Sequence, residues 1–210
     1  MLHVETVHAG TLDLLKDLQS IPELADMRLV GGTALALQLG HRTSVDLDLF
    51  GSFDDNISFK QVIAGRGHSV EGDIEGAVQT LMVDGVKVDL VNYKYPWLAP
   101  AIEESGVRLA APDDIMPMKL SAAANRGRKK DFIDIATLLE SHTLAEMLAL
   151  YRRKFSVTEI SNALRGLTYF DDAESAPSPR MFSDLTWKEA KSRITSAVRD
   201  FIFSETPLPQ

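Results

Sequence analysis

Two aspartates one residue apart are the most informative chemical feature of the sequence. Asp46 and Asp48 lie in the run VDLDLF, in which polar and apolar residues alternate. The alternation predicts a strand that buries Val45, Leu47 and Leu49 and presents both carboxylates on its other face. Two like charges so close repel each other and favour a bound cation, and Mg²⁺ is a hard cation that takes oxygen ligands. The pair therefore predicts a metal site.

A glycine pair precedes these acids at a point where a phosphate could bind. A short predicted strand ends at Gly31 and Gly32, and a helix-forming segment, Thr33–Leu39, follows until Gly40. Glycine lets the backbone approach a ligand closely, and the free N–H groups of a helix N-terminus attract anions. Gly31, Gly32 and Thr33 are therefore candidates for holding a triphosphate.

Each half of this pattern also has an ordinary structural explanation. A glycine pair before a helix is common, and an Asp-Leu-Asp strand is often a solvated edge. The combination, with thirteen residues between Gly32 and Asp46, resembles the signature of the nucleotidyltransferase superfamily. Similarity to the AbiEii-type nucleotidyltransferase toxins within it rests on Gly-Gly-Thr-Ala-Leu together with His41, Arg42, Ser44, Asp46 and Asp48. Many superfamily members have serine where this chain has Gly32, which leaves Thr33 to supply a hydroxyl.

A third acid is expected on a neighbouring strand, and Asp89 lies in a suitable segment. Residues 77–83 and 86–91 are two strand-like runs separated by Asp84-Gly85, which predicts a hairpin with a two-residue turn. Asp89 would share a face with Lys87. The ordinary alternative is an exposed strand residue near that lysine. Together with Asp46 and Asp48, Asp89 is our third candidate metal ligand.

Two predicted helices follow, over residues 112–126 and 129–139. If the first continued through Gly127, its small and basic residues would form one stripe of Lys119, Ala123, Arg126 and Lys130. The second helix has a core face of Phe132, Ile135, Ala136 and Leu139, and it places Asp131 and Asp134 on another face. An acidic first turn on an amphipathic helix would explain these aspartates without chemistry.

The resemblance gives these residues further roles. AbiEii-like proteins carry a lysine helix followed by a Lys-Asp-Phe-x-Asp segment, and the matching positions here are Lys119, Arg126, Lys130, Asp131 and Asp134. The resemblance implies that Lys119 contacts nucleotide phosphates, together with Arg126, and that Asp131 or Asp134 is a candidate base.

Arginines and lysines elsewhere leave several alternatives open. Arg42 could reach a phosphate or could pair with a site carboxylate and fix it, and we favour the second role. A basic cluster of Arg126, Arg128, Lys129 and Lys130 could dock an RNA end or could be a solvated turn, and it could be joined by Arg152, Arg153 and Lys154. His3, His8, His68 and His142 are expected on the surface or in loops, whereas His41 is less clear.

The element pattern predicts an α/β (α+β) chain in two parts. Residues 1–110 mix short strands and helices, as in a nucleotidyltransferase-like mixed sheet with flanking helices, and residues 111–210 form a helical C-terminal lobe. A closing helix over 187–203 and a tail over 206–210 end the chain. We expect the catalytic site between the two lobes.

Composition narrows the class of protein. The 210 residues carry a net charge of −8, which argues against a broad nucleic-acid surface but allows a local one. There is no cysteine, so disulfides and thiolate zinc sites are excluded, and no apolar run of membrane-spanning length occurs. We expect a cytoplasmic protein.

These observations predict Mg²⁺-dependent transfer of a nucleotidyl group from a nucleoside triphosphate (NTP) to an acceptor hydroxyl. Asp46, Asp48 and Asp89 would hold the metal. Resemblance to the toxins implies a cognate antitoxin and a transfer-RNA 3′ end as acceptor. Transfer to a small molecule such as an aminoglycoside is an alternative, because an acidic surface suits a cationic substrate. A catalytically silent nucleotide-binding or protein-binding module is another.

Overall fold

The computed structural model describes residues 1–205, except for the side chains of residues 73–75 and 205. The predicted tail over 206–210 lies outside this part. The chain folds into two compact units. The first comprises Met1–Pro96 and Pro100–Ala111, and the second comprises Trp97–Ala99 and the chain from Pro112 onward. The short segment Trp97–Ala99 therefore belongs to the second unit although first-unit residues flank it.

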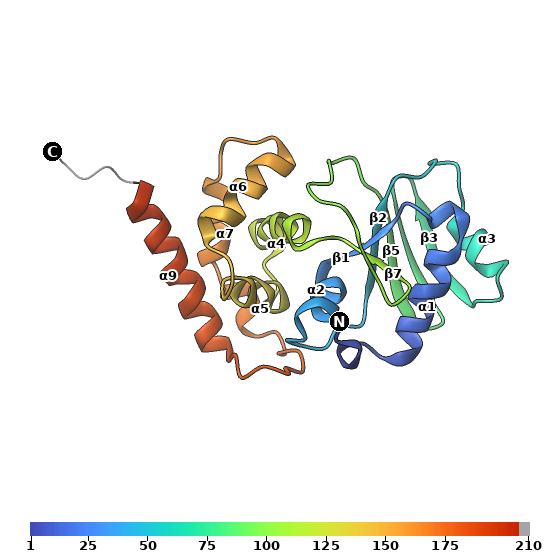
Figure 1. Ribbon diagram of the computed structural model, residues 1–210, viewed down its shortest axis with the longest axis horizontal. Coiled ribbons are helices and arrows are strands. Elements are labelled where there is room, and N and C mark those ends of the chain that lie inside the picture. The colour runs from blue at the N-terminus through green and yellow to red at the C-terminus, as the bar shows by residue number, and fades with distance from the viewer. Residues whose placement is uncertain (206–210) are drawn as a thin grey trace. The chain divides into compact units, whose positions relative to one another are not determined.

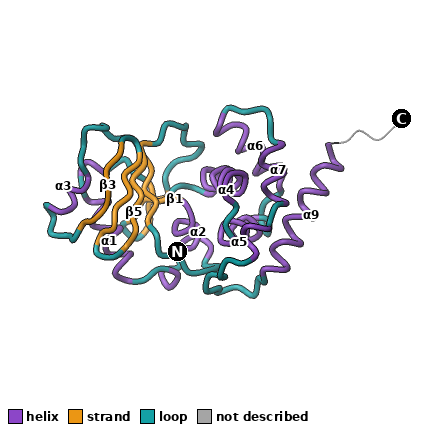
Figure 2. The backbone as a smooth tube through the Cα atoms, turned by 180° about the vertical axis from the view of Figure 1, so that it is seen from behind, coloured by secondary structure: helices purple, strands orange, loops and turns teal. Residues whose placement is uncertain are grey.

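The first unit is built on a mixed sheet, as the sequence predicts. Its seven strands within the described residues form one twisted layer in the order β3-β4-β5-β2-β1-β7-β6 (Figure 2). The pairs β2–β5 and β1–β7 are parallel, and the other neighbours are antiparallel. The bounds are β1 (Arg28–Val30), β2 (Leu47–Gly51), β3 (Val70–Glu75), β4 (Val78–Val83), β5 (Val86–Asn92), β6 (Ile102–Glu104) and β7 (Val107–Leu109).

The predicted hairpin over residues 77–91 is confirmed. Val83 pairs with Val86 across the turn, and Asp84 and Gly85 have positive φ angles of 49° and 81°. Two consecutive left-handed residues make the twisted turn that joins antiparallel strands best. Every second residue of β4 is buried, so one side of this hairpin packs on the core and the other is open.

Helices of the first unit are α1 (Ala9–Ser20), α2 (Gly31–Leu39) and α3 (Phe59–Ala64), with 3₁₀ turns η1 (Val4–Thr6) and η2 (Pro22–Leu24). Strand β1 leads directly into α2, which ends at the left-handed Gly40 as predicted. Segment 57–59, which leads into α3, packs on the closed side of β4, where the buried Gln79 amide donates to the Ile57 carbonyl and accepts from the Phe59 N–H.

One detail of the predicted acidic strand is wrong. Strand β2 begins at Leu47 rather than at Val45, and Val45 is 64% exposed instead of buried. The reason is local, because the Thr33 hydroxyl donates to the Asp46 carbonyl and also bonds Ser44 Oγ at 2.9 Å. These bonds hold the chain before Leu47 outside the strand ladder.

The second unit contains helices and no β-strand within its described residues (Figure 1). Its helices are α4 (Pro112–Arg126), α5 (Lys129–Leu138), α6 (Leu144–Phe155), α7 (Ser161–Thr168), α8 (Asp171–Glu174) and α9 (Trp187–Glu205). Thr143 and Glu146 form a reciprocal capping box at the start of α6. The rings of Phe132, Phe170 and Trp187 pack together with centroids 5.0 to 6.0 Å apart. None of the helices described is long and apolar enough to cross a membrane.

The condition for a single basic stripe, a helix that continues through Gly127, is not met. Helix α4 ends at Arg126, and α5 begins at Lys129, so Arg126 and Lys130 lie on different helices. A side chain at Gly127 would place its Cβ 2.8 Å from the Phe132 ring. The glycine therefore lets the chain turn closely over Phe132, and this packing separates the two helices.

Candidate functional site

Asp48 and Asp89 lie side by side on the parallel strands β2 and β5. They are register partners, so their side chains share one face of the sheet. The neighbouring residues Leu47, Leu49 and Leu90 point to the opposite face and are fully buried. Strand alternation therefore anchors both strands in the core and presents the two carboxylates together.

Asp89 is held by two partners from the same hairpin. Its Oδ2 forms an ion pair with the Lys87 ammonium, and its Oδ1 accepts a hydrogen bond of 2.8 Å from the Thr80 hydroxyl. Thr80 is the cross-strand partner of Asp89 on β4. The side chain is 21% exposed, so the carboxylate is fixed but solvent still reaches it.

Asp46 lies one residue before β2, and α2 positions it. The Thr33 side chain is 1% exposed and donates to the Asp46 carbonyl. Thr33 therefore supports the segment that carries Asp46, whereas its contact with a phosphate stays a prediction.

The two glycines allow charged side chains to approach the start of α2. A Cβ on Gly31, whose φ is +69°, would lie 2.3 Å from Asp48 Oδ2. A Cβ on Gly32 would lie 2.5 Å from Arg42 Nη2. A carboxylate and a guanidinium thus reach the first turn of the helix only because both positions lack side chains.

Arg42 is buried behind this turn. It is 1% exposed, and its Nη1 donates to the Thr43 carbonyl at 2.9 Å. Arg42 is buried against Gly32. This burial agrees better with a supporting role than with a mobile side chain that contacts a phosphate. Its assignment to either role stays a prediction.

The acidic residues match the donor chemistry of a hard divalent cation. All three predicted ligands offer carboxylate oxygens, and two of them are register partners. Among the side chains that the structure describes, however, no group of three or more His, Asp or Glu is arranged as a metal site. The structure therefore brings together Asp48 and Asp89, with Asp89 neutralised by Lys87, and does not show a complete ligand set.

Lys119, Asp131 and Asp134 come together inside the second unit. Lys119 Nζ lies 2.9 Å from Asp131 Oδ1 and 2.7 Å from Asp134 Oδ2, and all three side chains are at most 7% exposed. Asp131 Oδ2 is buried and makes no hydrogen bond with any described residue. A buried carboxylate oxygen without a donor is costly, and such atoms occur where a ligand or water binds.

The basic cluster beside these residues is smaller than the sequence suggests. Arg126, the last residue of α4, and Arg128, which precedes α5, are exposed. Lys129 is 7% exposed, donates to the Glu174 carbonyl and lies over the Trp187 ring. Lys154, which the sequence offered as an extension of the cluster, is completely buried, so that prediction is wrong.

Lys154 instead forms a buried ion pair that the sequence analysis missed. Its Nζ lies 2.6 Å from Asp114 Oδ1 and over the ring of Trp97. Asp114 also accepts backbone hydrogen bonds from Leu98 at 2.8 Å and Ala99 at 3.2 Å. This arrangement fixes the segment Trp97–Ala99 within the helical unit.

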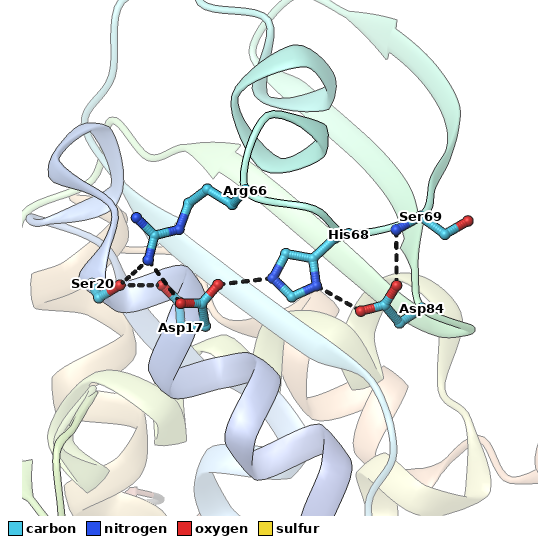
Figure 3. Close-up of polar contacts among 6 residues, drawn as sticks. All are labelled: Asp17, Ser20, Arg66, His68, Ser69 and Asp84. Atoms are coloured by element: carbon cyan, nitrogen blue, oxygen red, sulfur yellow. Dashed lines mark hydrogen bonds and ion pairs between the residues drawn. The ribbon is translucent and has the colours of Figure 1, made fainter.

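A second titratable cluster, also missed, surrounds His68 (Figure 3). Nε2 of His68 lies 2.8 Å from Asp17 of α1, and Nδ1 lies 2.6 Å from Asp84 in the β4–β5 turn. Hydrogen bonds to these two carboxylates raise the pKa of His68. Arg66 bonds Asp17 at 2.8 Å, and Arg66 followed by His68 lowers the pKa of Asp17 to about 2.

The His68 cluster is a structural clasp rather than a second reactive centre. Each of its charged groups already faces an opposite charge, and the Ser69 N–H also donates to Asp84. Perturbed pKa values often mark active sites, but ion-pair networks perturb them in the same way. Asp17, His68 and Asp84 are far apart in the chain, so no local sequence pattern predicts that they meet.

Comparisons with known proteins agree with this geometry. A family model described as the nucleotidyl transferase AbiEii toxin of type IV toxin–antitoxin systems matches residues 13–95 and 69–207. An uncharacterized protein of Aquifex aeolicus is 29% identical over 201 residues, covering 90% of this chain and 95% of that one.

Two solved structures share the fold. The nucleotidyltransferase toxin MenT4 from Mycobacterium tuberculosis has a TM-score of 0.56 at 15% identity, covering 95% of this chain and 87% of that one. JHP933 from Helicobacter pylori has a TM-score of 0.54 at 18% identity, covering 94% of each chain. The α/β fold with a mixed sheet, as predicted, is therefore confirmed, and the family match spans both units. The chain belongs to the AbiEii family of nucleotidyltransferases.

Proposed function

We propose that this nucleotidyltransferase is the toxin of a toxin–antitoxin pair and transfers a nucleotidyl group from an NTP to a hydroxyl of an RNA, such as a transfer-RNA 3′ end. The observation that carries the proposal is the register pairing of Asp48 with Asp89 on one sheet face, next to the glycine turn that begins α2. Carboxylates beside a helix N-terminus combine a cation site with an anion site.

The metal part of the proposal assigns Mg²⁺ to Asp46, Asp48 and Asp89. When bound, the ion would neutralise charge that develops on the phosphates. Thr80 would keep the Asp89 carboxylate oriented, and Lys87 would give up its ion pair to the cation. The glycine turn would hold the triphosphate through backbone N–H groups of Gly31, Gly32 and Thr33, and Arg42 would keep the turn charged and compact.

The second part concerns Lys119 and its two aspartates. We assign Lys119, with Arg126, to the phosphates of the nucleotide. Asp131 is the better candidate for orienting or deprotonating the acceptor hydroxyl, because its Oδ2 is the buried oxygen without a donor. Asp134 then keeps Lys119 charged and in place.

The acceptor and partners rest on the family. Its description as a toxin of a two-component system supports a cognate antitoxin, and a cytoplasmic site of action would give access to NTP and RNA. The net charge of −8 favours a second candidate, transfer to a cationic small molecule.

The decisive experiment incubates the protein with each α-labelled NTP, Mg²⁺ and total cellular RNA. We expect label on RNA with one or a few nucleotides. The variant Asp48→Asn should lose this label, whereas Asp13→Asn, which changes an exposed carboxylate on α1, should keep it. Circular dichroism checks that both variants are folded.

Other outcomes would redirect the assignment. Label on aminoglycosides but not on RNA would favour the small-molecule reaction. Nucleotide binding without pyrophosphate release for any acceptor would favour a catalytically silent module. Undiminished transfer by Asp48→Asn would overturn the assigned metal site.

A further inference from the structure

A polar cavity lies within the helical unit, apart from Lys119 and its aspartates. Its volume is about 580 Å³, which is within the range of small-ligand sites. It is open to solvent and lies between the end of α4, α6 and the length of α7. Its lining consists of Ala124, Asn125, Tyr151, Asn162, Arg165, Gly166, Thr168 and Tyr169. The proposed transfer reaction assigns no role to these residues.

The lining has an unusual composition for an acidic protein. The chain carries 30 acidic against 22 basic residues, but no carboxylate lines this cavity, and its one charged lining residue is Arg165. Two tyrosines, two asparagines and a threonine supply the rest of the polar surface. A site with this lining suits a planar, hydrogen-bonding ligand that carries negative charge, and it disfavours a cation.

The two asparagine amides are oriented by neighbouring groups. Arg165 Nη2 donates to Asn162 Oδ1 at 2.7 Å, which turns the Asn162 amide so that its N–H₂ is the group left for a ligand. Asn125 Nδ2 donates to the Ser121 carbonyl at 2.8 Å, which leaves the Asn125 carbonyl oxygen as an acceptor. The two amides therefore present one donor and one acceptor, the pairing found along the edge of a nucleobase.

Tyr169 offers an aromatic surface at the mouth of the cavity. Tyr169 is 53% exposed, so much of its ring is in contact with water. A ligand that stacks on the ring would bury this apolar surface. Asp172 and Asp171 raise the pKa of Tyr169, and the Tyr169 hydroxyl donates to Asp172 at 3.5 Å. These carboxylates repel anions, so a phosphate of the ligand would lie toward Arg165 while the base covers the ring. Tyr151 is held on the other side by its edge-on contact with Phe155, with centroids 5.0 Å apart.

Gly166 keeps the base of the cavity close-packed. A Cβ at this position would lie 2.5 Å from the Ala124 Cα, so α7 meets α4 at backbone distance. Such contact between helices leaves little freedom for the residues that stand on either side, Asn125 and Arg165. The cavity is thus part of the packed helical unit rather than an opening in a loop.

We propose that this cavity binds an unpaired nucleobase of the RNA acceptor, with Tyr169 as the stacking surface, the two asparagines on the base edge and Arg165 on a phosphate. Single-stranded RNA is recognised in this way, by stacking on aromatic rings and by hydrogen bonds to base edges. The proposal rests on the proposed function, because it takes RNA as the acceptor. It adds a site that binds the RNA acceptor at a nucleotide other than the one whose hydroxyl reacts.

The test measures binding of a fluorescein-labelled single-stranded RNA to the full chain by anisotropy, without NTP or Mg²⁺. Tyr169→Leu should weaken binding about tenfold, because a stacked base contributes on this scale. The matched control is Tyr95→Leu, which removes an equally exposed tyrosine from the first unit and should leave affinity unchanged. Thermal unfolding of each variant checks the fold, and RNA containing 4-thiouridine should crosslink to the peptide that carries Tyr169.

The outcomes separate this proposal from the proposed function. Equal affinities of Tyr169→Leu and Tyr95→Leu, or crosslinks that avoid the α7 region, would overturn it. A mixture of nucleoside monophosphates that competes as well as the RNA strand would also overturn it, because the site would then serve free nucleotides. Tyr169-dependent RNA binding by a protein that never transfers nucleotides would support the cavity while the proposed transfer fails.

Discussion

Two buried lysine–aspartate arrangements begin on α4, and they differ in how completely their oxygens are satisfied. Asp114 meets Lys154 and two backbone N–H groups, so donors reach both of its oxygens. Asp131 shares Lys119 with Asp134, but its Oδ2 receives no hydrogen bond from a described residue. Both arrangements are at least nine-tenths buried.

The difference separates a structural ion pair from a chemical one. A buried pair whose oxygens all have donors has nothing left to offer a substrate, and it fixes the chain around it. A buried carboxylate with an unused oxygen costs stability, and proteins keep such an atom when a ligand meets it. Burial and charge alone do not distinguish the two cases. The two cases differ in how many carboxylate oxygens accept a hydrogen bond or an ion pair.

The largest expected effect on folding comes from breaking the satisfied pair. Lys154→Met removes the cation and leaves the fully buried Asp114 carboxyl group without its ion-pair partner, so the free energy of unfolding should fall by about 3 to 5 kcal/mol. Urea denaturation measures this loss. The exposed neighbour Arg152→Met is the control and should change stability by less than about 1 kcal/mol. Equal midpoints for the two variants would contradict the structural role of the pair.

The unsatisfied carboxylate should respond in the opposite way. Asp131→Asn keeps the shape and the partner Asp134, so stability should change little. Nucleotidyl transfer should fall at least about a hundredfold, the scale of a lost general base. Initial rates with labelled NTP, together with a urea titration of the same preparation, check both halves.

The opposite outcome for Asp131→Asn, lost stability with retained transfer, would contradict the proposed difference between Asp131 and Asp114. If Asp131→Asn unfolded easily yet retained transfer in its folded fraction, Asp131 would belong with Asp114 as a structural residue. A second variant, Asp134→Asn, should lower the transfer rate by weakening the hold on Lys119, and this would show as a higher KM for NTP more than as a lower kcat.

Asp89 tests in the sheet whether the hydrogen bonds that a carboxylate receives decide how it binds a ligand. Thr80→Val removes the hydroxyl that donates to Asp89 but keeps the strand residue, so Mg²⁺ affinity should fall about tenfold, as for one charge-assisted hydrogen bond. Isothermal titration with Mg²⁺ or Mn²⁺ measures this. Thr80→Ser restores the donor and should restore binding. Equal weakening by valine and serine would mean that Thr80 acts only through packing.

The smallest expected effect concerns the clasp at His68, and it depends on pH. The pKa of His68 is raised in the folded state, so its charged form adds stability that is complete below its ordinary value and is lost as the pH rises through the raised value. His68→Gln should therefore lower stability at pH 6 by about 1 kcal/mol or less, since the partners are partly exposed.

At alkaline pH the two proteins should unfold at similar urea concentrations. A difference that grew with rising pH would contradict the assigned charge of His68. At the acid end, the lowered pKa of Asp17 adds stability that persists above its ordinary value and is lost as the pH falls toward about 2. Asp17→Asn should therefore resemble the parent only in strong acid.

Local patterns predicted much of the fold. The hairpin followed from alternating residues around Asp84-Gly85, and the helix over 112–126 followed from its composition and terminal residues. The adjacency of Asp48 and Asp89 was expected from two acidic strands, since a sheet must pair its strands somewhere. The hairpin and the helix depend on short stretches of sequence, whereas the pairing of Asp48 with Asp89 joins two strands that are distant in the chain.

Long-range partners were not predictable in the same way. Asp114 and Lys154 are 40 residues apart, and His68 meets Asp17 across 51 residues. Nothing in a local window distinguishes a lysine that will be buried from one that will be solvated, so Lys154 was placed with the wrong group. The sequence analysis gave Lys119 and the two aspartates, Asp131 and Asp134, separate roles. Their direct contact depends on how α4 packs on α5.

The segment Trp97–Ala99 has a consequence for dividing this protein into parts. The chain passes from one unit to the other three times, at residues 96–97, 99–100 and 111–112. A single cut near residue 111 would yield a helical fragment that lacks Trp97 and both backbone donors to Asp114. Such a fragment would carry a buried carboxylate with an incomplete shell, so the helical unit is not a portable module. Exchange of this unit between relatives would have to carry both segments together.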